Sequence, residues 1–178
     1  MREQLLHWIK CKHQRQMVRG TDRPYEEHLM FVAERAGAIV PLGYEIGLCH
    51  DLLEKTNVSS EELHTQLLAF GYTRFQAVHI TGCVNELTDV FTKQAFPNIG
   101  KKERKKLESQ RLSAISADAQ TVKYADLIYN IHWVMLYQRH KACAYLRRKQ
   151  KLVISMEKGD PELRHELLSL IERSLKRL

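Results

Sequence analysis

The chain has 178 residues, of which 44% are hydrophobic and 28% are charged. This balance is typical of a folded globular protein and excludes an intrinsically disordered chain. The length suits one domain over residues 1–178. The longest apolar runs, such as residues 36–42, are too short to cross a membrane, and the amphipathic N-terminus lacks a signal-peptide pattern. We therefore expect a cytoplasmic protein with no membrane partner.

Lys and Arg number 28 against 21 Asp and Glu, which gives a formal net charge of +7. An excess of positive charge favours an anionic ligand, either a phosphorylated small molecule or a nucleic acid. The four cysteines form no C-x-x-C pair, which excludes zinc-ribbon and thioredoxin-type sites. We expect ordinary reduced thiols.

Apolar residues recur every three or four positions along most of the chain, and the few glycines and prolines separate these periodic segments. The pattern predicts helices over about residues 5–12, 24–33, 44–53, 59–70, 73–87, 101–113, 118–137, 141–157 and 161–176. Residues 88–100 lack this periodicity and are expected to form a loop. Ser59 followed by Glu62 predicts a capping box. The expected fold class is all-α, a compact bundle of about eight to nine helices.

His50 and Asp51 stand side by side in an otherwise apolar predicted helix. Their burial is costly unless something pairs them, and a divalent cation does so, because imidazole and carboxylate groups suit Mn, Fe, Zn or Mg. Two adjacent residues cannot enclose a cation, so further ligands must come from other helices. His28 and Asp126, the only acid in its apolar helix, are the candidates. A helix cap or a salt bridge is the alternative explanation of the dipeptide alone.

Short sequence motifs lie at residues 13–16, 20–28, 48–56, 70–71, 87–89, 102–105, 122–126 and 129–130. In their order and spacing these motifs resemble the HD-domain metal-dependent phosphohydrolases, in particular the RelA/SpoT-type (p)ppGpp hydrolase domains and their stand-alone animal members. The resemblance covers a motif core of about residues 8–135, followed by C-terminal helices at 139–178. It implies a single HD-type helical domain.

The resemblance implies that His28, His50, Asp51 and Asp126 bind one divalent metal ion, with Mn²⁺ as the ion usual in this branch. It also implies a catalytic role for Glu54 beside Asp51, since Glu54 matches the acid that orients or deprotonates the attacking water. In a continuous helix, Glu54 would lie one turn after His50 on the same face. A surface salt bridge is the alternative for Glu54.

Five further residues are expected to contact the substrate: Lys123, Tyr129, Asn130, Arg19 and Arg23. Lys123 lies three positions before Asp126 and can meet a phosphate group. Asn130 lies four positions after Asp126 and can brace the pocket, or make a hydrogen bond at the helix end instead. The arginines precede the helix of His28, where a solvated loop is equally compatible with the sequence.

Lys55 stands where the family hydrolases have an Asp after the Glu. We expect its ammonium to keep Glu54 ionised and so to lower the pKa of Glu54. It should also move the preference away from (p)ppGpp toward another phosphorylated nucleotide.

The leading hypothesis is therefore a metal-dependent hydrolase of a phosphorylated nucleotide, resembling the (p)ppGpp pyrophosphohydrolases. The alternative is a non-catalytic HD module that holds metal and nucleotide for regulation, which Lys55 favours. A nucleic acid partner is not expected, because no helix-turn-helix or aromatic-rich basic patch is present. The oligomeric state is left open.

Overall fold

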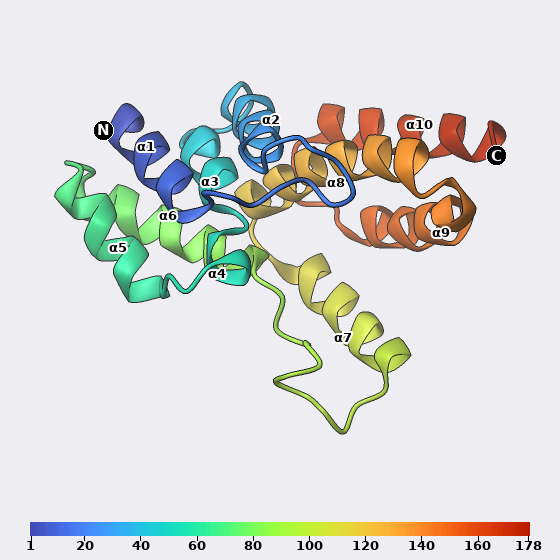
Figure 1. Ribbon diagram of the computed structural model, residues 1–178. Coiled ribbons are helices and arrows are strands. Elements are labelled where there is room, and N and C mark those ends of the chain that lie inside the picture. Colours follow the sequence, from blue (N-terminus) through green and yellow to red (C-terminus); the bar gives the residue numbers. More distant parts are fainter.

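Ten helices make up the computed structural model, which describes residues 1–178 (Figure 1). They are α1 (Arg2–Lys12), α2 (Glu26–Gly37), α3 (Gly43–Cys49), α4 (Leu52–Lys55), α5 (Ser60–Ala69), α6 (Arg74–Leu87), α7 (Lys101–Ala114), α8 (Ala117–Tyr137), α9 (Arg139–Ser155) and α10 (Pro161–Lys176). The only extended pairing is an isolated bridge between Met17 and Pro24. The expected all-α class is confirmed.

The helix expected over residues 44–53 is instead interrupted at His50 and Asp51, which separates α3 from the single turn of α4. This break accounts for one helix more than the expected eight to nine. Asp51 adopts φ −102° and ψ 0°, a sparsely populated backbone region in which many active-site residues are found. The interruption therefore falls on the two adjacent candidate ligands.

The helices share one apolar core of 37 buried residues, which extends from Leu5 in α1 to Ile171 in α10. Helix α8 crosses the middle of the bundle, with α9 and α10 beside it and α2 and α3 on its other side (Figure 1). Because α8 contacts helices on both sides, eleven of its residues are buried, Asp126 among them. No helix combines the length and the hydropathy that crossing a bilayer requires.

Helices α2 and α3 approach each other closely at Gly47. A Cβ atom at this position would lie 2.8 Å from Ala33 Cα and 2.9 Å from Val32 O, both of them backbone atoms of α2. Only glycine therefore fits without moving one helix. This contact brings the beginning of α2, which carries His28, next to the end of α3, which carries His50.

The start of α5 differs in one detail from the expected capping box. Ser59 accepts a hydrogen bond from the Glu62 backbone N–H at 3.1 Å, as expected, but the Glu62 carboxylate pairs with Lys12 Nζ at 2.8 Å. The nearby α1 supplies a cation that competes for this carboxylate. A complete capping box occurs at α6 instead, between Thr73 and Gln76.

We predict that Gly47→Ala lowers the free energy of unfolding by about 1–3 kcal/mol, because the added methyl group must push α3 away from α2. Gly82→Ala is the matched control, since Gly82 lies within α6 with no atom near its missing Cβ. Alanine there should be neutral or stabilising. Urea denaturation of the two variants measures the difference. Equal stabilities would contradict the close approach of the two helices.

Candidate metal centre

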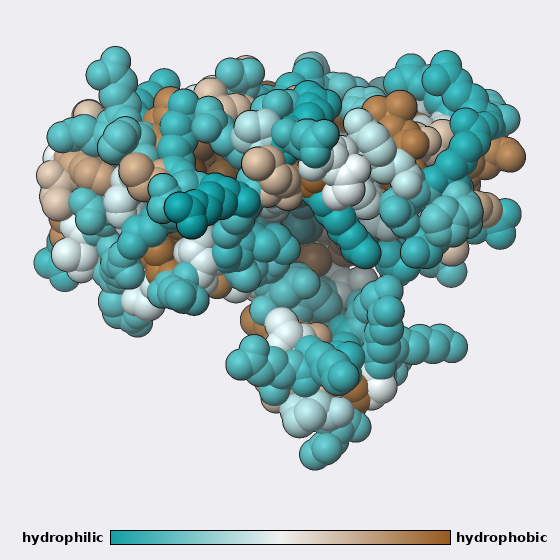
Figure 2. All heavy atoms as spheres, in the orientation of Figure 1, coloured by the Kyte–Doolittle hydropathy of each residue, from teal (hydrophilic) through white to brown (hydrophobic).

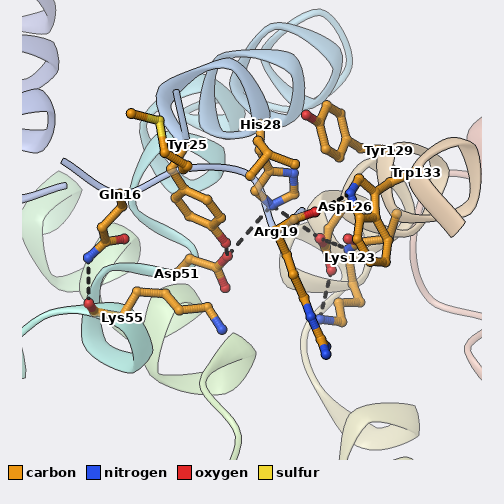
Figure 3. Close-up of a pocket in the computed structure, with 13 residues that line it drawn as sticks. Gln16, Arg19, Tyr25, His28, Asp51, Lys55, Lys123, Asp126, Tyr129 and Trp133 are labelled. Atoms are coloured by element: carbon orange, nitrogen blue, oxygen red, sulfur yellow. Dashed lines mark hydrogen bonds and ion pairs between the residues drawn. The ribbon is translucent and has the colours of Figure 1, made fainter. Parts of the chain in front are cut away.

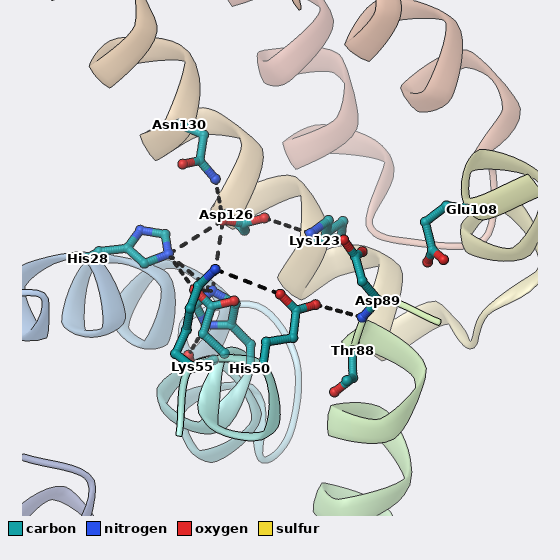
Figure 4. A network of polar contacts seen from close by, with 12 residues as sticks. His28, His50, Lys55, Thr88, Asp89, Glu108, Lys123, Asp126 and Asn130 are labelled. Atoms are coloured by element: carbon teal, nitrogen blue, oxygen red, sulfur yellow. Dashed lines mark hydrogen bonds and ion pairs between the residues drawn. The ribbon is translucent and has the colours of Figure 1, made fainter. Parts of the chain in front are cut away.

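The structure brings together the four predicted metal ligands from three parts of the chain (Figure 4). His28 comes from α2, His50 and Asp51 from the break between α3 and α4, and Asp126 from α8. His28 Nε2 lies 3.1 Å from His50 Nε2, 3.6 Å from Asp51 Oδ2 and 3.5 Å from Asp126 Oδ1. His50 Nε2 lies 3.5 Å and 3.8 Å from the same two carboxylate oxygens.

These separations suit a shared cation. Ligand atoms placed about 2.0–2.2 Å from one metal ion lie roughly 3 to 4 Å from one another. The ligand atoms of His28, His50 and Asp51 all lie within 4.8 Å of each other, and Asp126 Oδ1 closes the group from the side of α8. Two imidazole nitrogens and two carboxylates form a donor set that suits a divalent transition metal.

The electrostatics of the cluster favour cation binding. Burial would raise the pKa of Asp51, but the neighbouring His50 and His28 hold this pKa well below its ordinary value. Burial likewise opposes ionisation of Asp126, while Lys123 and the two imidazoles lower its pKa. Burial lowers the pKa of His50, which favours the neutral imidazole that binds metal. Two anionic oxygens and a neutral ring nitrogen thus face the same point.

Further hydrogen bonds fix the orientation of the ligands. His50 Nδ1 donates to the Gly47 carbonyl oxygen at 2.7 Å, so its lone pair is on Nε2, which faces the cluster. Tyr25 OH donates to Asp51 Oδ2. On α8, Asp126 accepts Asn130 Nδ2 at 2.5 Å and pairs with Lys123 Nζ at 2.8 Å (Figure 4). His28 Nδ1 is buried without a partner.

A cleft of about 530 Å³ opens over this cluster, and we call it the metal cleft (Figure 3). Its lining combines the ligands His28, Asp51 and Asp126 with Gln16, Met17, Val18, Arg19, Tyr25, Lys55, Lys123, Tyr129, Asn130 and Trp133. Three of these side chains are cationic and three are aromatic. The arrangement can accept a ligand that has both phosphate groups and an aromatic ring.

Four of the five predicted substrate contacts line the metal cleft, and Arg23 does not. The Arg23 guanidinium pairs with Glu27 at 2.5 Å and borders a separate cavity of about 200 Å³. The ion pair with Glu27, four residues further along the chain, thus holds the Arg23 side chain away from the metal cleft. Arg19, in contrast, is anchored through its backbone, because Trp133 Nε1 donates to its carbonyl oxygen at 2.9 Å.

Glu54 borders a second cavity of about 210 Å³, which we call the inner cavity, and Lys123 borders both spaces. Glu54 Oε1 accepts the Asp89 backbone N–H at 2.6 Å, and Glu54 Oε2 lies 3.9 Å from Lys55 Nζ. Burial and the charge of Asp89 raise the pKa of Glu54. The expectation that Lys55 lowers this pKa is therefore wrong, because a half-exposed ammonium at that distance is outweighed by burial.

Sequence reasoning did not select two of the aromatic residues in the cleft. Tyr25 lies in the matched segment 20–28, but nothing in its spacing indicated a bond to Asp51. Trp133 lies at helical spacing among apolar residues, and its side chain packs against the apolar core. The same side chain also lines the cleft and bridges α8 to the loop at Arg19 (Figure 3). Such a contact between distant segments leaves no local pattern.

No family model and no curated protein sequence matches this chain. Among solved structures, the chain is similar to a metazoan ortholog of SpoT that hydrolyses ppGpp. The likeness has a TM-score of 0.75 at 23% sequence identity and covers 97% of this chain and 95% of that chain. The protein therefore has the fold of a ppGpp hydrolase along nearly its whole length, and the fold that the sequence motifs implied is confirmed.

We predict that Mn²⁺ raises the thermal unfolding midpoint of the protein, since a ligand at 100 times its dissociation constant stabilises the folded state by about 2.7 kcal/mol. Asp51→Asn should abolish the shift by removing one anionic ligand. Glu157→Gln removes an exposed acid far along the chain and should leave the shift unchanged. Equal shifts in both variants would place metal binding elsewhere.

Proposed function

We propose that this protein is a metal-dependent phosphohydrolase that cleaves a phosphate ester of a phosphorylated nucleotide. The observation that carries the proposal is the convergence of His28, His50, Asp51 and Asp126 at the base of a cleft with cationic and aromatic walls. The fold shared with a ppGpp-hydrolysing protein supports the same class of reaction.

The four converging side chains would hold the metal ion, and Mn²⁺ fits their nitrogen and carboxylate donors. A divalent ion held there would lower the pKa of water and offset negative charge on a phosphoryl oxygen. Asn130 and Lys123 keep the Asp126 carboxylate in place through their contacts with its two oxygens. Tyr25 does the same for Asp51.

Glu54 is the proposed proton acceptor for the attacking water. Its raised pKa brings its basicity closer to neutral pH, where a general base is most effective, and such a base contributes about 10²- to 10⁴-fold. The Asp89 backbone N–H holds Glu54 Oε1 at 2.6 Å, which leaves the other oxygen on the side of Lys55.

Lys123, Lys55 and Arg19 are the proposed phosphate contacts. Burial alone would lower the pKa of Lys123, but the charge of Asp126 raises it, so this side chain stays cationic. The aromatic faces of Tyr129 and Trp133 would contact the base or ribose. If the substrate is (p)ppGpp, water would add to the 3′-phosphorus and give a proton to Glu54. The bond from phosphorus to ribose O3′ would break, O3′ would take up a proton to become a hydroxyl, and pyrophosphate would be released.

A non-catalytic module that binds metal and nucleotide is the second candidate. Lys55 favours the binding module, because its ammonium borders the cleft next to Glu54 and can occupy the position that the attacking water would need. Quenching of Trp133 fluorescence by nucleotide would report binding in either case. Binding without any turnover in the presence of Mn²⁺ would favour the module over the enzyme.

The hydrolase proposal predicts release of phosphate or pyrophosphate from at least one nucleotide in a panel that includes ppGpp, with Mn²⁺ present. A chelator should stop the reaction and added Mn²⁺ should restore it. Asp51→Ala should reduce turnover to the uncatalysed background, whereas Glu157→Gln should keep it. Full activity in Asp51→Ala would locate the chemistry outside this cluster.

For Lys55 we predict weak turnover of ppGpp by the wild type, with kcat/KM below about 10⁴ M⁻¹s⁻¹. Lys55→Asp should raise the kcat/KM for ppGpp relative to that for the preferred nucleotide, because it removes a cation and adds a carboxylate beside Glu54. Lys55→Met separates these effects, since it removes the charge alone. Efficient hydrolysis of ppGpp by the wild type would show that Lys55 does not set the substrate.

A further inference from the structure

A strongly basic groove lies between α7 and α9, outside the metal cleft. It has a volume of about 820 Å³ and is lined by Lys101, Lys102, Glu103, Lys105, Lys106, Ser109, Gln110, Ser113, Arg148, Lys151, Leu152 and Ser155. Helix α7 projects from the bundle (Figure 1), and Figure 2 shows mostly hydrophilic side chains over this projecting part. We call this space the basic groove.

The charge of the basic groove is almost uncompensated. Six of its side chains are cationic and one is acidic, and the only ion pair among them joins Lys106 to Glu103 at 3.9 Å. Some basic residues elsewhere on the surface have closer partners, such as Arg2 with Glu45 at 2.7 Å. The groove thus carries most of the net charge of +7. A concentrated positive field of this kind attracts anions.

The position of these cations is also unfavourable for helix α7 itself. Four of the groove's five lysines, Lys101, Lys102, Lys105 and Lys106, occupy the first two turns of α7, where the helix dipole is positive and favours acids. Gly100 at the N-cap provides no side-chain cap. Partial burial, followed by the charges of Arg148 and Lys101, lowers the pKa of Lys105. A bound anion would relieve the repulsion both within α7 and between α7 and α9.

The lining indicates the chemistry of the ligand. Leu152 is its only apolar residue and no aromatic ring lines it. The hydroxyl groups of Ser109, Ser113 and Ser155 each donate to a backbone carbonyl of their own helix, so the cationic side chains are the groups left to bind an anion. Lysines act as point charges for phosphate, while recognition of single-stranded nucleic acid depends on aromatic platforms for the bases. We propose that the basic groove binds linear inorganic polyphosphate, a chain of phosphates without bases.

This site is distinct from the metal centre, and the proposal goes beyond the hydrolase function. The inner cavity lies between the two spaces and shares Lys105 and Arg148 with the basic groove. Three carboxylates, from Glu54, Asp89 and Glu108, and four basic side chains, from Lys105, Lys123, Arg148 and Lys149, border this cavity. The basic groove shares no lining residue with the metal cleft, so binding of polyphosphate in the groove does not need the metal ligands.

The test compares two double variants that lose the same charge. Lys105→Gln with Lys151→Gln removes one cation from each wall of the basic groove. Lys141→Gln with Arg147→Gln removes two exposed cations of α9 that do not line the groove. Fluorescence anisotropy of a labelled short polyphosphate, without divalent metal, gives the dissociation constants over a range of salt concentrations.

We expect the groove variant to bind polyphosphate at least about tenfold more weakly than the wild type and the control variant to stay within about twofold. The slope of log affinity against log salt should fall by about 2 in the groove variant, one for each lost contact.

Equal weakening in both variants would overturn the proposal in favour of diffuse attraction. Absence of wild-type binding, or tighter binding of an unstructured oligonucleotide through the same lysines, would also overturn it. The Asp51→Ala protein should bind polyphosphate like the wild type, so a failed hydrolase assay does not affect this test.

Discussion

The ion pair between Lys123 and Asp126 is the interaction on which the site depends. Both groups lie one turn apart on α8, at 2.8 Å, and both are largely removed from water. A buried charge without a partner would cost several kcal/mol, so the carboxylate and the ammonium hold each other in place. The second oxygen of Asp126 remains directed at His28 and His50, where it completes the ligand group. Helix α8 therefore supplies one ligand and the charge that keeps this ligand ionised.

The opposite side of the site depends on backbone packing. Gly47 lets α3 approach α2, and the same residue accepts the hydrogen bond that orients His50. Beyond His50 the helix is interrupted, so Asp51 joins the ligands while Glu54 borders the inner cavity. The interruption separates the two acids by role, since the pKa of Asp51 is lowered beside His50 and His28 whereas burial raises the pKa of Glu54. A continuous helix would place these groups differently.

The sequence could predict the helices and which polar side chains come together at the site, because apolar periodicity reports burial and because a His or an Asp among apolar residues needs a partner. It could not predict effects that depend on contacts between distant segments. Glu62 is captured by Lys12 from another helix, and Trp133 reaches the Arg19 carbonyl across the cleft. The pKa of Glu54 is a further example. The adjacent Lys55 can be read from the sequence, whereas the burial that raises the pKa of Glu54 depends on the fold.

The distribution of charge divides the molecule into two anion-attracting regions with different chemistry. In the metal cleft, cations stand among aromatic rings and next to carboxylates, so in the proposed function charge, ring stacking and metal binding would act together on one small molecule. In the basic groove, cations stand among hydroxyl groups with almost no carboxylate or ring, so charge acts alone along a line. The two regions share no lining residue, and the inner cavity between them is bordered by three carboxylates and four basic side chains. The positive net charge of the chain therefore reflects a local concentration on α7 and α9 more than a general property of its surface.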